Sequence, residues 1–383
     1  MSDEGATAVR GLGGRYRSAL HDERTAALLG VALGVSFTLC FATGLWSHLQ
    51  QDPPAWFSAP SRPAGLYRVT QGIHVTSGVA AIPLLLAKLW VVHPRLVEWP
   101  PARSVLHAIE RLALLPLVGG GVFLLFSGVA NVARWYPWTF FFPRAHFWAA
   151  WITIGGLVVH VGAKAATTRR VLRRSPPSST PTPAAADRRG FLAGVAAAST
   201  ALVVTTAGGT IAPLGTVSVL AQRRPGDGPQ GLPVNKSAAS ARVTEIARDP
   251  AFRLVIDGAV DHPLALSLAE LRAMPAREAT LPIACVEGWS QSATWRGVPL
   301  RDLLALAGAR PETATVTVES LQPSGRYRAS EISGDQLRDP DTLLALELGG
   351  EPLHIDHGFP TRLIGPNRPG VLQTKWVARL EVR

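Results

Sequence analysis

Four apolar segments in the first half of the chain constrain its fold more than any other feature. A membrane-spanning helix needs about 20 consecutive apolar residues to cross the hydrocarbon layer of a bilayer. Each segment is longer than the helices of an ordinary soluble core, and the four follow one another closely. The sequence therefore predicts a membrane all-α helical bundle, with spans at about 25–47, 69–92, 112–133 and 145–163.

Composition divides the chain into two parts. Of 383 residues, 47% are hydrophobic and 17% are charged, which excludes a disordered chain and argues against a single soluble domain. Two cysteines are too few for a disulfide framework, a cysteine zinc cage or a cysteine-held iron–sulfur cluster. The net charge of +11 does not indicate nucleic-acid binding, because much of the arginine and lysine flanks the apolar segments.

The distribution of these cations predicts the topology. Cytoplasmic loops carry an excess of lysine and arginine. Such residues cluster before the first span and after the fourth, so both ends of the bundle are expected in the cytoplasm. The loops at 48–68 and 134–144 then face outward, and the second of them resembles an interfacial aromatic belt. The cations are Arg10, Arg15, Arg17 and Arg24, then Lys164, Arg169, Arg170, Arg173 and Arg174.

A fifth span is predicted after a Pro/Ser-rich stretch. Arg188 and Arg189 precede Phe191 and an apolar run that lacks charge until Arg223. This pattern resembles a twin-arginine export signal, which implies the twin-arginine translocase as a partner during export. Two alternatives stay open: the arginines obey only the positive-inside rule, or the run ends in a cleavage site near 219–221.

These features give a full domain organisation, in which the last domain lies on the extracytoplasmic side of the cell membrane. The expected parts are a cytoplasmic N-terminal segment at 1–24, a four-span bundle at 25–166, a cytoplasmic linker at 167–187, the signal and fifth span at 188–222, an extracytoplasmic linker at 223–242, and the C-terminal domain at 243–383.

Histidines within the spans are candidates for haem ligands, because ionisable residues inside a bilayer are costly. His146 and His160 are 14 residues apart. This spacing corresponds to about 21 Å along a helix, on nearly one face. We predict an outer iron ligated by His74 and His146, with His48 as the alternative, and leave the partner of His160 open. His107 lies at the charged inner boundary and is not expected to bind haem.

The bundle resembles the membrane-embedded b-type cytochromes. That resemblance implies one or two b-type haems and exchange of electrons with the membrane quinone pool.

In the last part of the chain, short stretches of alternating apolar and polar residues predict strands, as in a soluble α+β domain. Strands are predicted at 252–258, 315–319, 342–348 and 376–382, and one more leads into Cys285. Ser267 and Glu270 form a capping-box pattern at the start of a short helix. A second short helix is expected at 298–304.

Two separated motifs resemble the sulfite-oxidase-type molybdopterin-binding domain, and the likeness extends over 243–383. The first runs Cys285-Val286-Glu287-Gly288-Trp289-Ser290, and the second runs Asp356-His357-Gly358-Phe359-Pro360-Thr361-Arg362, with Lys375 downstream. The first motif is most similar to that of the periplasmic methionine-sulfoxide reductase catalytic subunits.

The resemblance implies particular roles for these residues. Cys285 becomes the molybdenum ligand, and Tyr327 a residue that faces the metal. The cofactor, Mo-molybdopterin, is expected to bind at Cys285, Glu287, Trp289, His357, Arg362 and Lys375. The residue types agree, because a thiolate is a soft metal ligand and cations suit the phosphate end of a pterin.

Together these patterns predict a membrane-anchored molybdenum oxidoreductase fused to its own cytochrome. The expected reaction is oxygen-atom transfer, as reduction of a small-molecule or protein S-oxide or N-oxide. Two alternatives remain: a sulfite-oxidising enzyme that passes electrons to the membrane, and a haem-free anchored cofactor-binding module.

Overall fold

The computed structural model describes residues 18–96, 104–173, 183–224, 226–310 and 314–383. The chain divides into two compact units. The first combines Met1–Ala42 with His74–Val204, and the second combines Thr43–Ile73 with Thr205–Arg383. The stretch that links the first two long helices is therefore part of the C-terminal unit.

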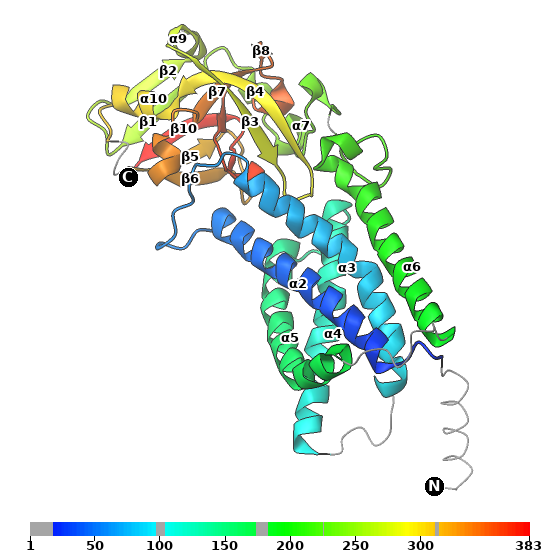
Figure 1. Cartoon of the computed structure of the whole chain (residues 1–383). Coiled ribbons are helices and arrows are strands. Elements are labelled where there is room, and N and C mark those ends of the chain that lie inside the picture. The colour runs from blue at the N-terminus through cyan, green and yellow to red at the C-terminus, as the bar shows by residue number, and fades with distance from the viewer. Residues whose placement is uncertain (1–17, 97–103, 174–182, 225, 311–313) are drawn as a thin grey trace. The chain divides into compact units, whose positions relative to one another are not determined.

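Five helices in the described residues are long and apolar enough to cross a membrane, which confirms the predicted spans (Figure 1). Large apolar side chains stay exposed along them; Val105, Leu112 and Leu115 are 79%, 66% and 68% exposed. Such surfaces suit lipid rather than water. The helices are α2 (Glu23–Gln51), α3 (Leu66–Leu96), α4 (Val105–Val132), α5 (Phe142–Arg173) and α6 (Pro183–Thr206).

Small residues bring α4 and α5 close together. A Cβ on Gly156 would lie 3.2 Å from the carbonyl oxygen of Ala113, and one on Gly120 would lie 2.2 Å from the hydroxyl of Thr153. Close approach through small residues is how helices commonly pack in membranes. The two helices therefore form a tight antiparallel pair.

The boundaries around the fifth helix differ from the expected ones. The cytoplasmic linker expected at 167–187 is largely helical, because α5 continues to Arg173 through good helix formers and α6 begins at Pro183. Residues 174–182 lie outside the described part. At its other end α6 stops at Thr206, well before residue 222, and two 3-10 turns follow, η1 (Ala207–Gly209) and η2 (Ala212–Leu214).

The stretch expected as an extracytoplasmic linker, 223–242, packs as part of the soluble domain. Leu232 is 1% exposed and lies in the same apolar cluster as Cys285. Ala238 and Ala241 are also buried, within α7 (Ala238–Ala241). The apolar side chains in this stretch explain the difference, since burying them stabilises the domain.

Two five-stranded sheets form the soluble domain (Figure 1). The order in the first sheet is β2-β1-β10-β5-β6, in which β1 and β10 are parallel, and in the second β3-β4-β7-β8, with β9 paired to β7. The strands are β1 (Arg253–Gly258), β2 (Leu264–Ser267), β3 (Arg277–Ala284), β4 (Ser290–Pro299), β5 (Thr315–Ser320), β6 (Ala329–Ser333), β7 (Leu343–Leu348), β8 (Glu351–Pro352), β9 (Arg362–Ile364) and β10 (Val377–Val382).

Short helices connect the strands, and the predicted elements are confirmed. The side chain of Ser267 accepts from the backbone of Glu270, whose carboxylate accepts from the backbone of Ser267, so the capping box is present. The helices are α8 (Thr244–Ala247), α9 (Leu268–Ala273), α10 (Leu300–Leu306) and α11 (Gly334–Arg338), and the 3-10 turns are η3 (Pro229–Gly231), η4 (Ile355–His357) and η5 (Gly370–Leu372). The fold is therefore five apolar helices followed by an α+β domain.

Candidate active site

Cys285 lies in a tight turn between β3 and β4. Its backbone N–H donates to the carbonyl of Trp289 at 2.9 Å, and its own carbonyl accepts from Gly288 at 3.1 Å. Gly288 has a φ of 82°, a conformation that favours glycine. The turn therefore holds the Cys285 side chain in one place, where the residue is 2% exposed.

The environment of Cys285 favours a neutral thiol until a metal binds. Burial raises the pKa of Cys285 to about 12, and the charge of Glu287 adds to the rise. Metal binding to a thiol releases its proton. Cys285 is thus a poor free nucleophile, and a bound metal ion would release its proton.

Residues that lie before the Cys285 motif in the sequence hold the Cys285 turn in place. Arg223 forms an ion pair with Glu287 at 3.1 Å, and both side chains are 14% exposed. The hydroxyl of Thr210 donates to the carbonyl of Gly288 at 2.8 Å. Glu287, expected to bind cofactor, thus has a protein partner in Arg223.

Arg362 and Lys375 are buried cations without a carboxylate partner among the described residues. They are 5% and 9% exposed, and their backbones pair in an isolated bridge. Burial lowers the pKa of Arg362 to about 9, and burial also lowers the pKa of Lys375 well below its usual value. Buried charges are costly unless paired, so this pair of cations suits an anionic ligand such as a phosphate.

His357 lies beside these cations but is not one of them. Burial lowers its pKa to about 4, so the ring is neutral at pH 7. Its Nε2–H donates to the carbonyl of Pro229 at 2.7 Å, and its own carbonyl accepts from Arg362 at 3.1 Å. The structure therefore gives His357 a positioning role toward Arg362.

Four buried donors of this region have no acceptor within the described residues. They are Nε of Arg362, one terminal nitrogen of Arg223 and the indole nitrogens of Trp289 and Trp295. The guanidinium of Arg362 also lies over the Trp295 ring, 5.2 Å from its centroid. Because buried donors are normally satisfied, these atoms fit a cofactor rich in nitrogen and oxygen acceptors.

Tyr327 is half-buried in the turn between β5 and β6. Burial raises the pKa of Tyr327, so its hydroxyl stays protonated and can donate a hydrogen bond at neutral pH. Its expected role toward the metal stays a prediction.

Two further buried residues of the domain were not predicted. Arg368 is 3% exposed, and Tyr67, at the start of α3, is 1% exposed and donates its backbone N–H to the side-chain oxygen of Asn367, next to Arg368 in sequence. The glycine- and proline-rich run around Arg368 was a signal for an unusual loop. Nothing local in the sequence connects Tyr67 with the soluble domain.

In the helical unit the structure brings His74 and His146 together. Their ring centroids are 6.1 Å apart, with the rings tilted by 70°. Nδ1 of His74 donates to the carbonyl of Cys40 at 2.8 Å, and Nδ1 of His146 lies 2.9 Å from the hydroxyl of Ser127. Metal-binding histidines commonly use one nitrogen in this way and coordinate through the other.

Both remaining nitrogens are therefore suited to coordinate one metal ion, since metal–imidazole bonds are about 2 Å long. The pair fits the axial ligation of a haem.

The other predicted haem ligands are less well placed. His48 belongs to the other compact unit. Nδ1 of His160 is buried without a hydrogen-bond partner, and no histidine ring contacts it within the described ranges. His107, which was not expected to bind haem, donates its backbone N–H to the side chain of Ser104, the N-cap of α4. A second haem is thus left with one candidate ligand, His160.

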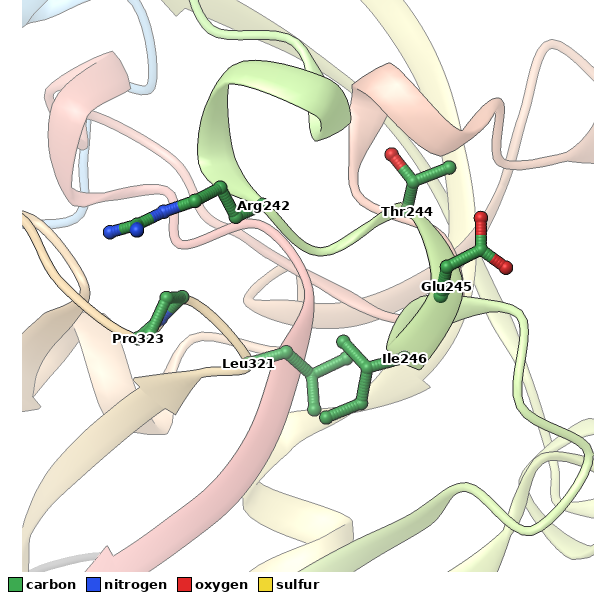
Figure 2. Close-up of a pocket in the computed structure, with 6 residues that line it drawn as sticks. All are labelled: Arg242, Thr244, Glu245, Ile246, Leu321 and Pro323. Atoms are coloured by element: carbon green, nitrogen blue, oxygen red, sulfur yellow. The ribbon is translucent and has the colours of Figure 1, made fainter.

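A surface hollow of about 440 Å³ lies elsewhere on the soluble domain (Figure 2). None of the site residues above lines it. Its lining is Arg242, Thr244, Glu245, Ile246, Leu321 and Pro323.

Residues 241–383 match the family described as oxidoreductase molybdopterin binding domain. The C-terminal part of the chain is therefore a molybdopterin-binding domain of the sulfite oxidase type, as its cysteine turn and buried cations indicate. Over this part the chain is similar to proteins named as oxidoreductases.

Individual relatives match about a third of this chain. The mitochondrial sulfite oxidase of Rattus norvegicus is 34% identical over an alignment of 157 residues, and the match covers 34% of this chain and 29% of that protein. YedZ1 of Azospira oryzae, named as a protein-methionine-sulfoxide reductase subunit, is 34% identical over 131 residues, 34% of this chain and 48% of its own. The uncharacterized oxidoreductase YuiH of Bacillus subtilis is 31% identical over 131 residues, 34% of this chain and 64% of its own. The chain spans less than two thirds of each relative.

Proposed function

We propose that the chain is a membrane-anchored molybdenum oxidoreductase that reduces an S-oxide or N-oxide with electrons from the quinone pool, passed on through b-type haem. The observation that carries the proposal is the Cys285 turn beside the buried cations Arg362 and Lys375, which have the chemistry of a thiolate ligand and a phosphate site. The similarity to YedZ1, with its sulfoxide reductase name, supports the reductive direction.

Each residue has a defined task in this proposal. Cys285 Sγ binds molybdenum, and the molybdenum centre supplies the two-electron oxygen-atom chemistry. Arg362 and Lys375 hold the phosphate end of the pterin. Trp289 donates its indole N–H to the cofactor, and the hydroxyl of Tyr327 donates to the substrate oxygen.

The haem part of the proposal rests on the pair of His74 and His146. Both side chains are held by hydrogen bonds through Nδ1, so a haem iron would find two oriented imidazoles. The haem supplies one-electron transfer between the quinone pool and the molybdenum site. His160 is the candidate ligand for a second haem, and its partner stays open.

Assays of the purified holoprotein test the direction and the substrate. Reduced quinol analogue should be oxidised on addition of dimethyl sulfoxide, methionine sulfoxide or trimethylamine N-oxide. A second candidate, sulfite oxidation, is favoured by the similarity to the sulfite oxidases. Reduction of haem by sulfite, with no turnover of any S-oxide or N-oxide, would contradict our proposal. Absence of haem from active protein would favour the haem-free anchored module.

We also propose export through the twin-arginine translocase, to the extracytoplasmic side of the cell membrane. Arg188 and Arg189 lie in the first turns of α6, where Arg188 is 3.8 Å from Asp22. Replacing both arginines with lysine keeps the charges but removes the guanidinium groups. Loss of protease access to the domain from outside the cell would support the translocase, whereas unchanged access would leave only the positive-inside rule.

A further inference from the structure

The segment Pro60–Arg68, which follows α2 and ends in the first turn of α3, is bonded to the molybdopterin-binding domain within the same compact unit. Arg62 donates to both carboxylate oxygens of Asp339, at 2.9 Å each, and also to Asp341. Asp339 is 7% exposed. A bidentate arginine–carboxylate pair with one buried partner is stronger than an ordinary surface ion pair.

Asn367 is the central contact of this segment with the domain. Its backbone N–H donates to the carbonyl of Ala64 at 2.8 Å, and its side-chain nitrogen donates to the carbonyl of Pro60 at 2.6 Å. Its side-chain oxygen accepts from the backbone N–H of Tyr67 at 2.7 Å. Asn367 and Tyr67 are each 1% exposed. The backbone N–H, the side-chain nitrogen and the side-chain oxygen of Asn367 are thus all hydrogen-bonded to the segment.

The loop that carries Asn367 also touches the chain just before Cys285. A Cβ on Gly370 would lie 2.8 Å from the carbonyl oxygen of Ala284, so this glycine approaches the Cys285 turn as closely as backbone allows. Ala64 packs against the apolar cluster that contains Cys285. The loop therefore lies between the segment and the predicted metal ligand.

A second contact reaches the far end of the same turn. The guanidinium of Arg68 donates to the hydroxyl of Ser292, at 3.1 Å, near the start of β4. The segment thus contacts the strands on both sides of Cys285, directly through Arg68 and indirectly through Asn367.

We propose that Asn367 is a positioning residue, through which the segment Pro60–Arg68 sets the geometry of the Cys285 turn. The molybdenum site is then completed by a stretch that lies outside the family domain and belongs to the loop between two membrane helices. This inference rests on the proposed function, because it takes Cys285 to be the molybdenum ligand.

Three variants of the full chain test the proposal. Asn367→Gly removes the side-chain bonds but tolerates the φ of 49° at this position. Arg62→Ala removes the bidentate pair. Arg277→Ala is the matched control, because Arg277 also bonds Asp341, at 2.7 Å, and is 49% exposed against 52% for Arg62, yet it belongs to the domain's own β3.

Two measurements separate positioning from mere stability. Hydrogen exchange of the cofactor-free chain should show amides at 284–292 and 365–372 opening about tenfold more in both test variants, and no change in the control. One variant loses a charge-assisted pair and the other loses two neutral hydrogen bonds, and either loss is worth roughly a factor of ten in the opening equilibrium. In the loaded enzyme the Mo(V) resonance spectrum should shift in both variants, with turnover of dimethyl sulfoxide lowered when reduced viologen is the donor.

Two outcomes would overturn the proposal. The first is unchanged exchange at 284–292 in both test variants. The second is a Mo(V) spectrum that superimposes on that of the wild type although exchange has risen. If a variant loses molybdenum, the exchange comparison decides alone. A wild-type protein without molybdenum or without turnover would instead refute the proposed function, and it would leave the exchange result valid.

Discussion

Replacing Arg362 with methionine should have opposite effects on the cofactor-free and the loaded protein. Burial lowers the pKa of Arg362 from 12.5 to about 9. Each pKa unit corresponds to about 1.4 kcal/mol, so keeping this guanidinium charged costs the fold about 5 kcal/mol relative to the unfolded chain. Its bond to the carbonyl of His357 and its position over Trp295 each offset about 1.5 kcal/mol. The remaining cost is about 2 kcal/mol.

Methionine is apolar and of similar length, so Arg362→Met should stabilise the cofactor-free domain by about 2 kcal/mol. The same change removes a phosphate ligand. Cofactor retention should then fall by about 10- to 100-fold, the worth of one or two charge-assisted hydrogen bonds. The assay is urea unfolding of the full chain in detergent, from a host without molybdenum cofactor synthesis, followed by tryptophan fluorescence. Released pterin and molybdenum are measured on the loaded protein.

Arg368→Met is the matched control. Arg368 is equally buried, at 3% exposed, and its pKa is also about 9. It donates, however, to four protein acceptors, so its removal should destabilise the domain by about 2–4 kcal/mol. The reasoning fails if both variants shift the unfolding midpoint in the same direction, or if Arg362→Met keeps cofactor at the wild-type level. The acceptors are Gln336, Ser330, Leu372 and Glu331.

Three further predictions follow from the sites. Cys285→Ser should leave the secondary structure intact by circular dichroism but abolish turnover, because a hydroxyl replaces the thiolate; normal rates would refute its role as ligand. His74→Ala and His146→Ala should each remove most haem absorbance at unchanged molybdenum content, whereas His107→Ala should not; the reverse pattern would misplace the haem. Because the pKa of His357 is about 4 in the fold against 6.5 unfolded, the unfolded chain binds the proton first as pH falls. Unfolding free energy should therefore drop from about pH 6.5 to about pH 4, by up to about 3 kcal/mol, and His357→Gln should flatten that slope in urea titrations; an unchanged slope would refute it.

The sequence predicted what local patterns can encode. Apolar runs of sufficient length located the helices, and the Ser267 capping box located a helix start to the residue. The resemblance of two motifs, around Cys285 and around Arg362, to a known family predicted the molybdopterin-binding domain. Long-range packing was beyond reach: Arg62 and Asp339 are 277 residues apart, and no local pattern pairs them.

The sequence also did not show which charged side chains are buried. Arg368 cannot be told from an exposed arginine in the sequence, because only the folded loop buries its side chain away from solvent. The neutral state of His357 is a further case, since its low pKa comes from burial by residues far along the chain. The end of α6 was misplaced because the apolar run continues past Thr206, where glycines and a proline break the helix.

One compact unit contains both Thr43–Ile73 and Thr205–Arg383. This limits how many times the chain can cross the membrane between them. Parts that fold against one another must lie in the same compartment, so an even number of crossings has to separate them. The four helices α3, α4, α5 and α6 supply that even number. Adding or deleting a single span between the two parts would leave them in opposite compartments. The loop is also synthesised first, so it must wait on its side of the bilayer until the last of the chain has arrived.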